Sequence, residues 1–212
     1  MLGLLLQGQV ALFLLIVIAL VLSLSAHEFG HALVAKLFGD DTAQRAGRLT
    51  LNPLAHIDLI GLLMVVFIGF GYAKPVPTDP RNFRSRWAEL AVSSAGPAMN
   101  LLLAAVAINF YGWMVGLNLL QGRGPALFFT YLALINLVLM VFNLIPLGAL
   151  DGHYILPYFL SRSMASAYRA FNDRYGNMVL IGLLLLSFVG VPVFQFVMNV
   201  GRALMPLISF VG

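Results

Sequence analysis

The chain of 212 residues has no cysteine, and charged residues make up only 9% of it. Without thiols, disulfides and thiolate metal sites are excluded, so that histidine and the carboxylates remain as strong metal ligands. With 61% hydrophobic residues and a mean hydropathy of +0.95, the composition excludes an ordinary soluble domain. The longest hydrophilic interval, near residues 74–86, is too short for an inserted soluble domain. We therefore expect one integral membrane domain over residues 1–212.

The basic residues are not arranged as a nucleic-acid surface. The net charge is +4, but the cations fall mainly in short loops beside apolar runs, which is the positive-inside pattern of membrane proteins. Three such loops are basic: Arg45 and Arg48; Lys74, Arg81, Arg84 and Arg86; and Arg162, Arg169 and Arg174. We expect these loops on the cytoplasmic side, the glycine-containing loop 118–125 outside, and no nucleic-acid partner.

Apolar runs predict an all-α polytopic membrane protein with about five to six transmembrane or re-entrant segments. The first helix is expected to run inward over about residues 5–38, and residues 87–120 and 126–146 to cross outward and back. The glycine-containing run 59–72, which includes Gly69, is short and joins two loops of the same side, so a re-entrant segment is expected there. Residues 176–210 provide the C-terminal membrane segments.

Five residues at the inner end of the first run carry the chemistry, His27-Glu-Phe-Gly-His31. Residues four apart share a helix face, so His27 and His31 can bind one metal ion. Glu28 stands where its carboxylate can take a proton from an activated water. From Val10 to Ala26 the only polar residues are two serines, and ionisable groups at membrane depth are functional by default.

A hydrolytic zinc ion usually has three protein ligands, so a third is needed. Asp151 is the best candidate, because Pro146, Gly148 and Gly152 interrupt the preceding helix and broken helices at membrane depth line sites. The alternative for Asp151 is a helix-ending turn. Asp58 is a second candidate ligand, although it can simply cap the segment that follows it.

With these motifs, the sequence resembles the site-2 protease family of intramembrane zinc metalloproteases, in its compact form without an inserted peptide-binding domain. The resemblance rests on motifs between residues 27 and 152: His27-Glu-Phe-Gly-His31, Asn52-Pro-Leu-Ala-His-Ile-Asp58, Gly71-Tyr-Ala-Lys-Pro-Val-Pro77, Gly96-Pro-Ala-Met-Asn100 and Asn143-Leu-Ile-Pro-Leu-Gly-Ala-Leu-Asp151-Gly152. It implies one zinc ion per chain, bound by His27, His31 and Asp151, with Glu28 activating water.

The resemblance also implies that Asn100 and Asn143 lie beside the site. There an amide can bind the substrate backbone or a developing oxyanion, and the alternative is that each amide only ties helices together. His56 and His153 are expected to be accessory polar groups or sensors of protonation, and neither is expected to be a metal ligand. The extended stretch 71–77, poor in hydrogen-bond donors, either flanks the cleft, where it could gate it or pair with a substrate strand, or serves as a rigid linker.

The first functional hypothesis is a zinc-dependent endopeptidase that hydrolyses peptide bonds in transmembrane segments, with the active site toward the cytoplasmic side of a prokaryotic cell membrane. By the resemblance, membrane-anchored anti-sigma factors or remnant signal peptides would be among the substrates. A metal-ion transporter that uses the His/Asp cluster is the alternative, and an inactive scaffold is a third reading. A permeation path has no need of a base at position 28, which favours the protease.

Overall fold

The computed structural model describes residues 1–68 and 71–211, and every regular element in them is helical. The α-helices are α1 (Leu2–Leu6), α2 (Val10–Leu37), α3 (Thr42–Arg45), α4 (Leu59–Ile68), α5 (Ala88–Gly116), α6 (Arg123–Asn143), α7 (Asp151–Ile155), α8 (Arg162–Phe171), α9 (Asn177–Phe188) and α10 (Val193–Ile208). Short 3-10 turns stand at Pro53–Ala55, Pro80–Asn82 and Leu156–Phe159, and a π-helical turn at Asn172–Gly176 links α8 to α9. The predicted all-α class is confirmed.

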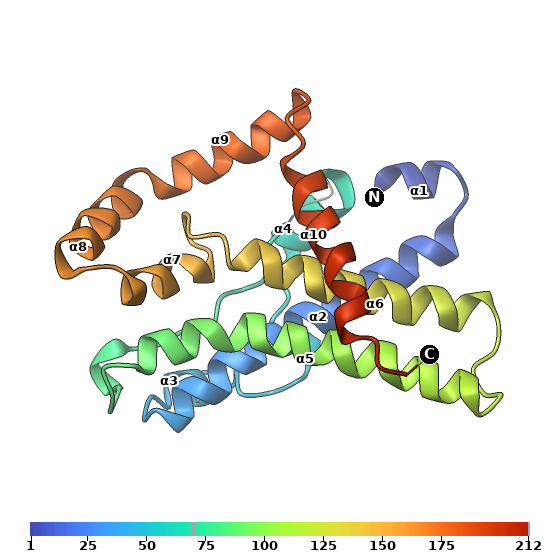
Figure 1. Cartoon of the computed structure of the whole chain (residues 1–212), viewed down its shortest axis with the longest axis horizontal. Coiled ribbons are helices and arrows are strands. Elements are labelled where there is room, and N and C mark those ends of the chain that lie inside the picture. Colours follow the sequence, from blue (N-terminus) through green and yellow to red (C-terminus); the bar gives the residue numbers. More distant parts are fainter. Residues whose placement is uncertain (69–70, 212) are drawn as a thin grey trace.

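Three of the described helices, α2, α5 and α6, are long and apolar enough to cross a membrane. They pack side by side as the centre of the molecule (Figure 1). Small side chains let them approach closely: Ala19, Ala107 and Leu132 form one buried cluster, and Ala104, Ala133 and Leu137 form another. Close packing through small residues is the usual way for helices to associate in lipid, where burial of apolar surface supplies little drive.

The remaining apolar helices are shorter than a bilayer requires. At 1.5 Å per residue, α9 with 12 residues and α10 with 16 are about 18 and 24 Å long, against a hydrocarbon core of about 30 Å. Figure 1 shows α8 and α9 leading away from the central helices, and α10 returning across α6. The expected helical pair at the C-terminal end is therefore present, and α2, α5 and α6 alone among the described helices reach spanning length.

One detail differs from the sequence prediction, and a second one refines it. The first helix does not begin at Leu5, because Gly8 adopts a left-handed φ of +71° and separates α1 from α2. The expected re-entrant segment is a helix of ten residues, α4, followed by Gly69, which lies outside the described residues. Since ten residues are too few to cross a bilayer, α4 fits a segment that enters without spanning.

A buried carboxylate ties the end of α2 to the loop before α5. Asp40 is fully buried and accepts hydrogen bonds from the Thr42 hydroxyl, the Asn82 amide and the backbone N–H of Asp79. Burial alone would raise the pKa of Asp40, but these hydrogen bonds prevail and lower it. The loop after α2 is thereby held against the basic loop that precedes α5.

Candidate metal centre

The two motif histidines lie one turn apart in the C-terminal half of α2 and face one another. Their Nε2 atoms are 3.0 Å apart, and His27 is only 5% exposed. The helix forms here because the surrounding residues are apolar or small, and Gly30 and Ala32 are buried against neighbouring segments. The i, i+4 spacing thus gives the predicted shared face.

Asp151, which is far from both histidines in the sequence, lies beside them in the structure. Its Oδ2 lies 3.2 Å from His27 Nε2, and its Oδ1 lies 3.3 Å from His31 Nε2. The three residues form the one group among the described residues with the composition and spacing to hold a metal ion, their ligand atoms all lying within 4.8 Å of one another. We call His27, His31 and Asp151 the metal group.

The interruption between α6 and α7 brings Asp151 to this position. Gly148 takes a left-handed φ of +62°, which favours glycine. The Asn172 amide exchanges two hydrogen bonds with the backbone of Gly148, at 2.8 and 3.0 Å. The chain turns there, and α7 begins at Asp151 itself. The predicted helix break is confirmed, and its brace, Asn172, was missed because it lies more than twenty residues away in the sequence.

Hydrogen bonds on the opposite ring nitrogens fix the tautomer of both histidines. His27 Nδ1 lies 2.6 Å from Asn100 Oδ1, and His31 Nδ1 lies 2.7 Å from the Val92 carbonyl. Both partners are acceptors, so each Nδ1 carries the proton, and each Nε2 keeps a lone pair that points toward the centre of the metal group. This is the form in which histidine binds a metal.

The chemistry of the donor set fits a zinc ion. Two Nε2 lone pairs and a carboxylate converge in a largely buried space, where a bound cation would compensate the charge of the carboxylate. Asp151 Oδ2 is buried and accepts no hydrogen bond among the described residues. Two imidazoles and a carboxylate are a common ligand set of catalytic zinc.

A network that sequence reasoning missed holds Asn100 in place. Asn100 is fully buried, and its amide donates to the Ser23 carbonyl at 3.2 Å and to Asn136 Oδ1 at 2.7 Å. Asn136, also fully buried, donates to the Ser23 hydroxyl at 2.7 Å. Because both amide hydrogens of Asn100 are used, its oxygen must face His27. Asn100 thus contacts a member of the metal group directly, and its expected contact with substrate stays a prediction.

The glycine of the Gly96-Pro97 pair lies against the metal group. A Cβ at position 96 would come within 2.3 Å of His31 Nε2 and 2.5 Å of His27 Cε1. Helix α5 can therefore pass beside the two imidazoles only if residue 96 has no side chain. The motif Gly96 to Asn100 supplies both a close approach and a hydrogen bond to His27.

Glu28, the expected base, is 8% exposed and bonds to a segment far away in the sequence. Its Oε2 accepts the backbone N–H of Val76 at 3.1 Å. The guanidinium of Arg48 donates to the carbonyls of Lys74 and Pro75 beside it. Burial lowers the pKa of Arg48, and the nearby charge of Glu28 opposes that shift. The extended stretch predicted at residues 71–77 is thus in contact with the candidate base.

The other predicted residues are not members of the metal group. Asn143 donates to the Leu139 carbonyl of its own helix, so its expected substrate contact stays a prediction. Asp58 accepts the Gly61 N–H and caps α4, as its alternative reading had it. His56 bonds to Thr50 and Arg48, and His153 lies 3.3 Å from the Tyr168 hydroxyl. Both histidines are outside the metal group.

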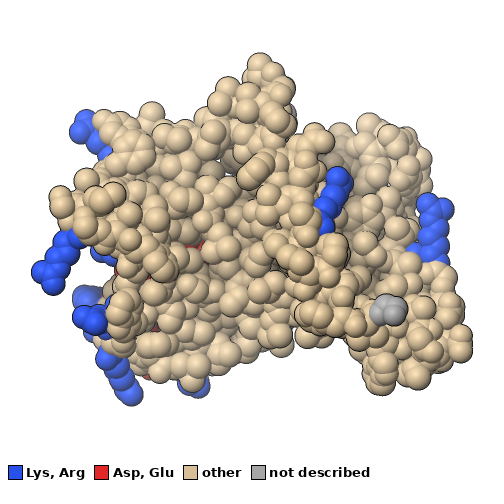
Figure 2. All heavy atoms as spheres, viewed as in Figure 1, with Lys and Arg blue, Asp and Glu red and all other residues tan. Residues whose placement is uncertain are grey.

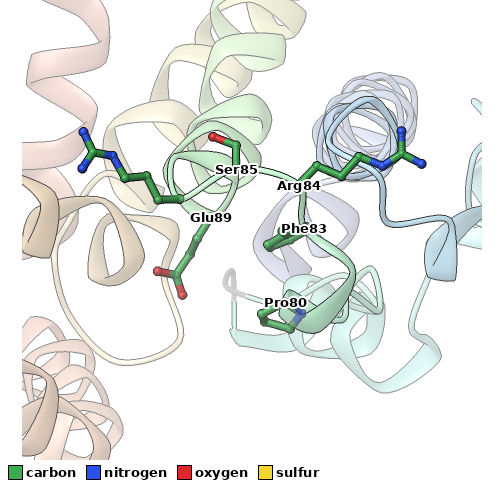
Figure 3. A pocket seen from close by; sticks show the side chains of 6 residues that line it. Pro80, Phe83, Arg84, Ser85 and Glu89 are labelled. Carbon is green, nitrogen blue, oxygen red and sulfur yellow. The ribbon is translucent and has the colours of Figure 1, made fainter.

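A depression of about 400 Å³ lies at the start of α5, away from this chemistry (Figure 3). Its lining residues are Pro80, Phe83, Arg84, Ser85, Arg86 and Glu89. The Arg84 and Glu89 side chains point to opposite sides in Figure 3. No residue of the metal group lines this depression.

Comparison with known proteins agrees with the geometry. The model of peptidase family M50 matches residues 15–126 and 120–187. The Bacillus subtilis protein named "Putative zinc metalloprotease YwhC" is 44% identical over 66% of this chain and 67% of its own length. Proteins named "Putative zinc metalloprotease Rip2" are 29% identical over 84% of this chain and 69% of the relative in Mycolicibacterium smegmatis, and 31% identical over 68% and 56% in Mycobacterium tuberculosis. No solved structure matches the chain.

Proposed function

The chain belongs to peptidase family M50, and from that premise we propose that it is an integral membrane zinc endopeptidase that cuts transmembrane segments of other membrane proteins. One observation carries the proposal: His27, His31 and Asp151 converge with their ligand atoms within 4.8 Å, beside a carboxylate at position 28, on a helix of spanning length. Together these features supply a zinc site and a base at membrane depth.

In this proposal each residue has a distinct role. The Nε2 atoms of His27 and His31 and the carboxylate of Asp151 would hold one zinc ion, which would supply Lewis-acid activation of a water molecule and of the peptide carbonyl. Glu28 takes the proton from that water and passes it to the leaving amine. Asn143 binds the substrate backbone as an uncharged donor. Asn100 keeps His27 in the metal-binding tautomer.

The substrate must be partly unwound before it reaches the zinc ion. A transmembrane helix uses its carbonyls in internal hydrogen bonds, so attack requires local opening of the helix. We expect small or helix-breaking residues near the cut. By family resemblance, membrane-anchored anti-sigma factors and remnant signal peptides are candidate substrates.

The proposal also covers topology and location. One membrane domain over residues 1–212 holds the site, in a prokaryotic cell membrane, with the site toward the cytoplasm. The distribution of cations supports this orientation, because most Lys and Arg side chains visible in Figure 2 gather at the end of the molecule that holds α3 and α8. Glu28 lies eight residues before Lys36 along α2, about 12 Å by the helical rise.

A metal-ion transporter is the less favoured alternative. A transport site needs ligands and a path, but it has no use for a carboxylate that is adjacent to a ligand and held by a backbone N–H. The family match and the names of the relatives also favour hydrolysis.

The decisive experiment replaces Glu28. Glu28→Gln removes the base and spares the three ligands, so the purified variant is expected to keep about one zinc ion and lose at least about 99% of its cleavage of transmembrane peptides. Zinc content and peptide cleavage are measured on the same preparation. Glu89→Gln is the matched control, since Glu89 lies on α5 and pairs with Arg169.

Two results would contradict the proposal. Cleavage by Glu28→Gln at the parental rate would remove Glu28 from the mechanism. Zinc flux into proteoliposomes, retained in this variant and without peptide cleavage by the parent, would establish the transporter.

A further inference from the structure

Residues 73–77, which we call the strap, run past the C-terminal half of α2. Pro75 and Pro77 lack N–H groups and favour an extended chain, and no regular element covers this stretch. Val76, between them, therefore carries the only backbone N–H among residues 75–77. That donor is directed at Glu28 Oε2, at 3.1 Å.

The strap is held from behind by a buried arginine. Arg48 is 6% exposed and donates to the carbonyls of Lys74 and, at 3.2 Å, of Pro75. These are the two residues that precede Val76. Burying a guanidinium costs free energy unless hydrogen bonds compensate the lost hydration. The carbonyls of Lys74 and Pro75 supply part of that compensation, so Arg48 and the strap stabilise each other.

His56 completes the support. It is 1% exposed, its Nε2 donates to the Thr50 carbonyl at 2.8 Å, and its Nδ1 accepts from Arg48 at 3.3 Å. The His56 carbonyl accepts the Lys74 N–H at 2.9 Å. Arg48 is thereby fixed in orientation, and a second hydrogen bond pins the start of the strap.

We propose that Arg48 is a positioning residue of the hydrolytic site, which seats the strap so that the Val76 N–H fixes one oxygen of Glu28 and leaves the other for proton transfer. The inference rests on the proposed function. A base must be held within a fraction of an ångström of its working geometry, and Glu28 accepts no other hydrogen bond among the described residues. Lysine can replace only in part the forked donor that reaches two adjacent carbonyls.

The first test removes the single donor. Val76→Pro abolishes the N–H within an already extended, proline-flanked stretch, and Val76→Ala trims the side chain but keeps the N–H. Because a hydrogen bond to a charged group is lost, kcat of Val76→Pro is expected about tenfold or more below that of Val76→Ala. KM and zinc content are expected to be equal in both. Equal kcat values, or loss of zinc from Val76→Pro, would overturn the inference.

The second test follows the strap without using catalysis. Ser25 is 3% exposed and lines a narrow crevice together with Tyr72 and Ala73, so a single cysteine there (Ser25→Cys) reports whether the strap is seated. Labelling of this cysteine by a thiol reagent is expected to accelerate about tenfold or more when Arg48→Met is added, and to be partly restored in Arg48→Lys. Arg162→Met, on exposed α8, is the control. Unchanged labelling in Arg48→Met would overturn the role of Arg48.

The two failures are distinguishable. If the parent protein cleaves no transmembrane peptide, the proposed function fails and this inference fails with it. If the parent cleaves and Val76→Pro matches Val76→Ala, only the positioning role is refuted.

Discussion

At the residue scale, zinc binding by the metal group, as proposed above, is expected to depend on side chains outside the group. His27 can present Nε2 only while Nδ1 donates to Asn100, and Asn100 keeps its oxygen toward His27 only while its amide donates to Ser23 and Asn136. Asn100, Asn136 and Ser23 are all 0% exposed, so water cannot replace a lost partner. An unsatisfied amide there costs about 1–3 kcal/mol.

Asn136→Leu is therefore expected to weaken zinc binding about 10- to 100-fold, although Asn136 lies outside the metal group. The affinity is measured by competition with a chelator of known affinity. Asn109→Leu is the matched control, because Asn109 is also an asparagine on an apolar helix, but it ties α5 to the C-terminal residues Ile208 and Phe210. Equal zinc affinities in the two variants would refute an orienting role for Asn136.

The sequence predicts residues whose chemistry is visible in a local pattern. His27, Glu28 and His31 share one helical turn, and Asp151 stands at a break marked by proline and glycine. Asn136 carries no such mark, because its partner Asn100 lies 36 positions away. Arg48 was counted only as a loop cation, since nothing local indicates that it is buried under residues 74 and 75.

At the scale of elements, the site depends on how closely α2 and α5 approach. Two glycines make the contact possible: a Cβ at Gly30 would meet Met99 Cγ at 2.5 Å and the Ala95 carbonyl at 2.8 Å, and one at Gly96 would meet both imidazoles. Glycine costs a helix roughly 0.5–1 kcal/mol relative to alanine. Glycine at these two positions therefore lowers local helix stability, but it permits the close approach of α2 and α5 that brings Val92 and Asn100 to the histidines.

Gly96→Ala is expected to lower zinc occupancy to less than about half, even though alanine is the better helix former. The added methyl group would have to displace His31 or separate the two helices. Gly116→Ala provides the control, since a Cβ there meets no atom within 4 Å and is expected to leave zinc occupancy unchanged. Zinc per chain is counted by elemental analysis after purification. Full occupancy in Gly96→Ala would mean that α5 can move away without cost.

Among the elements, long apolar runs were predicted best. The runs expected near residues 87–120 and 126–146 are α5 and α6, and the expected C-terminal pair is α9 and α10. The break at Gly8 was missed, because one glycine inside an apolar run is tolerated in many helices and only its left-handed φ ends the helix. Beyond α2, α5 and α6, which reach spanning length, the number of membrane segments stays a prediction.

At the scale of the whole molecule, positive charge is distributed unevenly between the two ends of the long helices. In Figure 2 most visible Lys and Arg side chains lie at one end, and few lie elsewhere. The loop between α5 and α6, at the opposite ends of these helices, is poor in charge and contains exposed Leu117 and Leu119. Under the positive-inside rule this polarity predicts that the end holding α3 and α8 faces the cytoplasm.

Single cysteines in this cysteine-free chain test the orientation directly. Leu119→Cys, at a side chain 52% exposed, is expected to react with a membrane-impermeant thiol reagent in intact cells. Ser163→Cys, on exposed α8, is expected to react only in inverted membrane vesicles. Since Glu28 lies about 12 Å inside Lys36, the same orientation predicts that water reaches the metal group from the cytoplasmic side, so Ala26→Cys is also expected to be labelled only in inverted vesicles. Labelling of Ser163→Cys in intact cells would reverse the topology and place the hydrolytic site toward the outside.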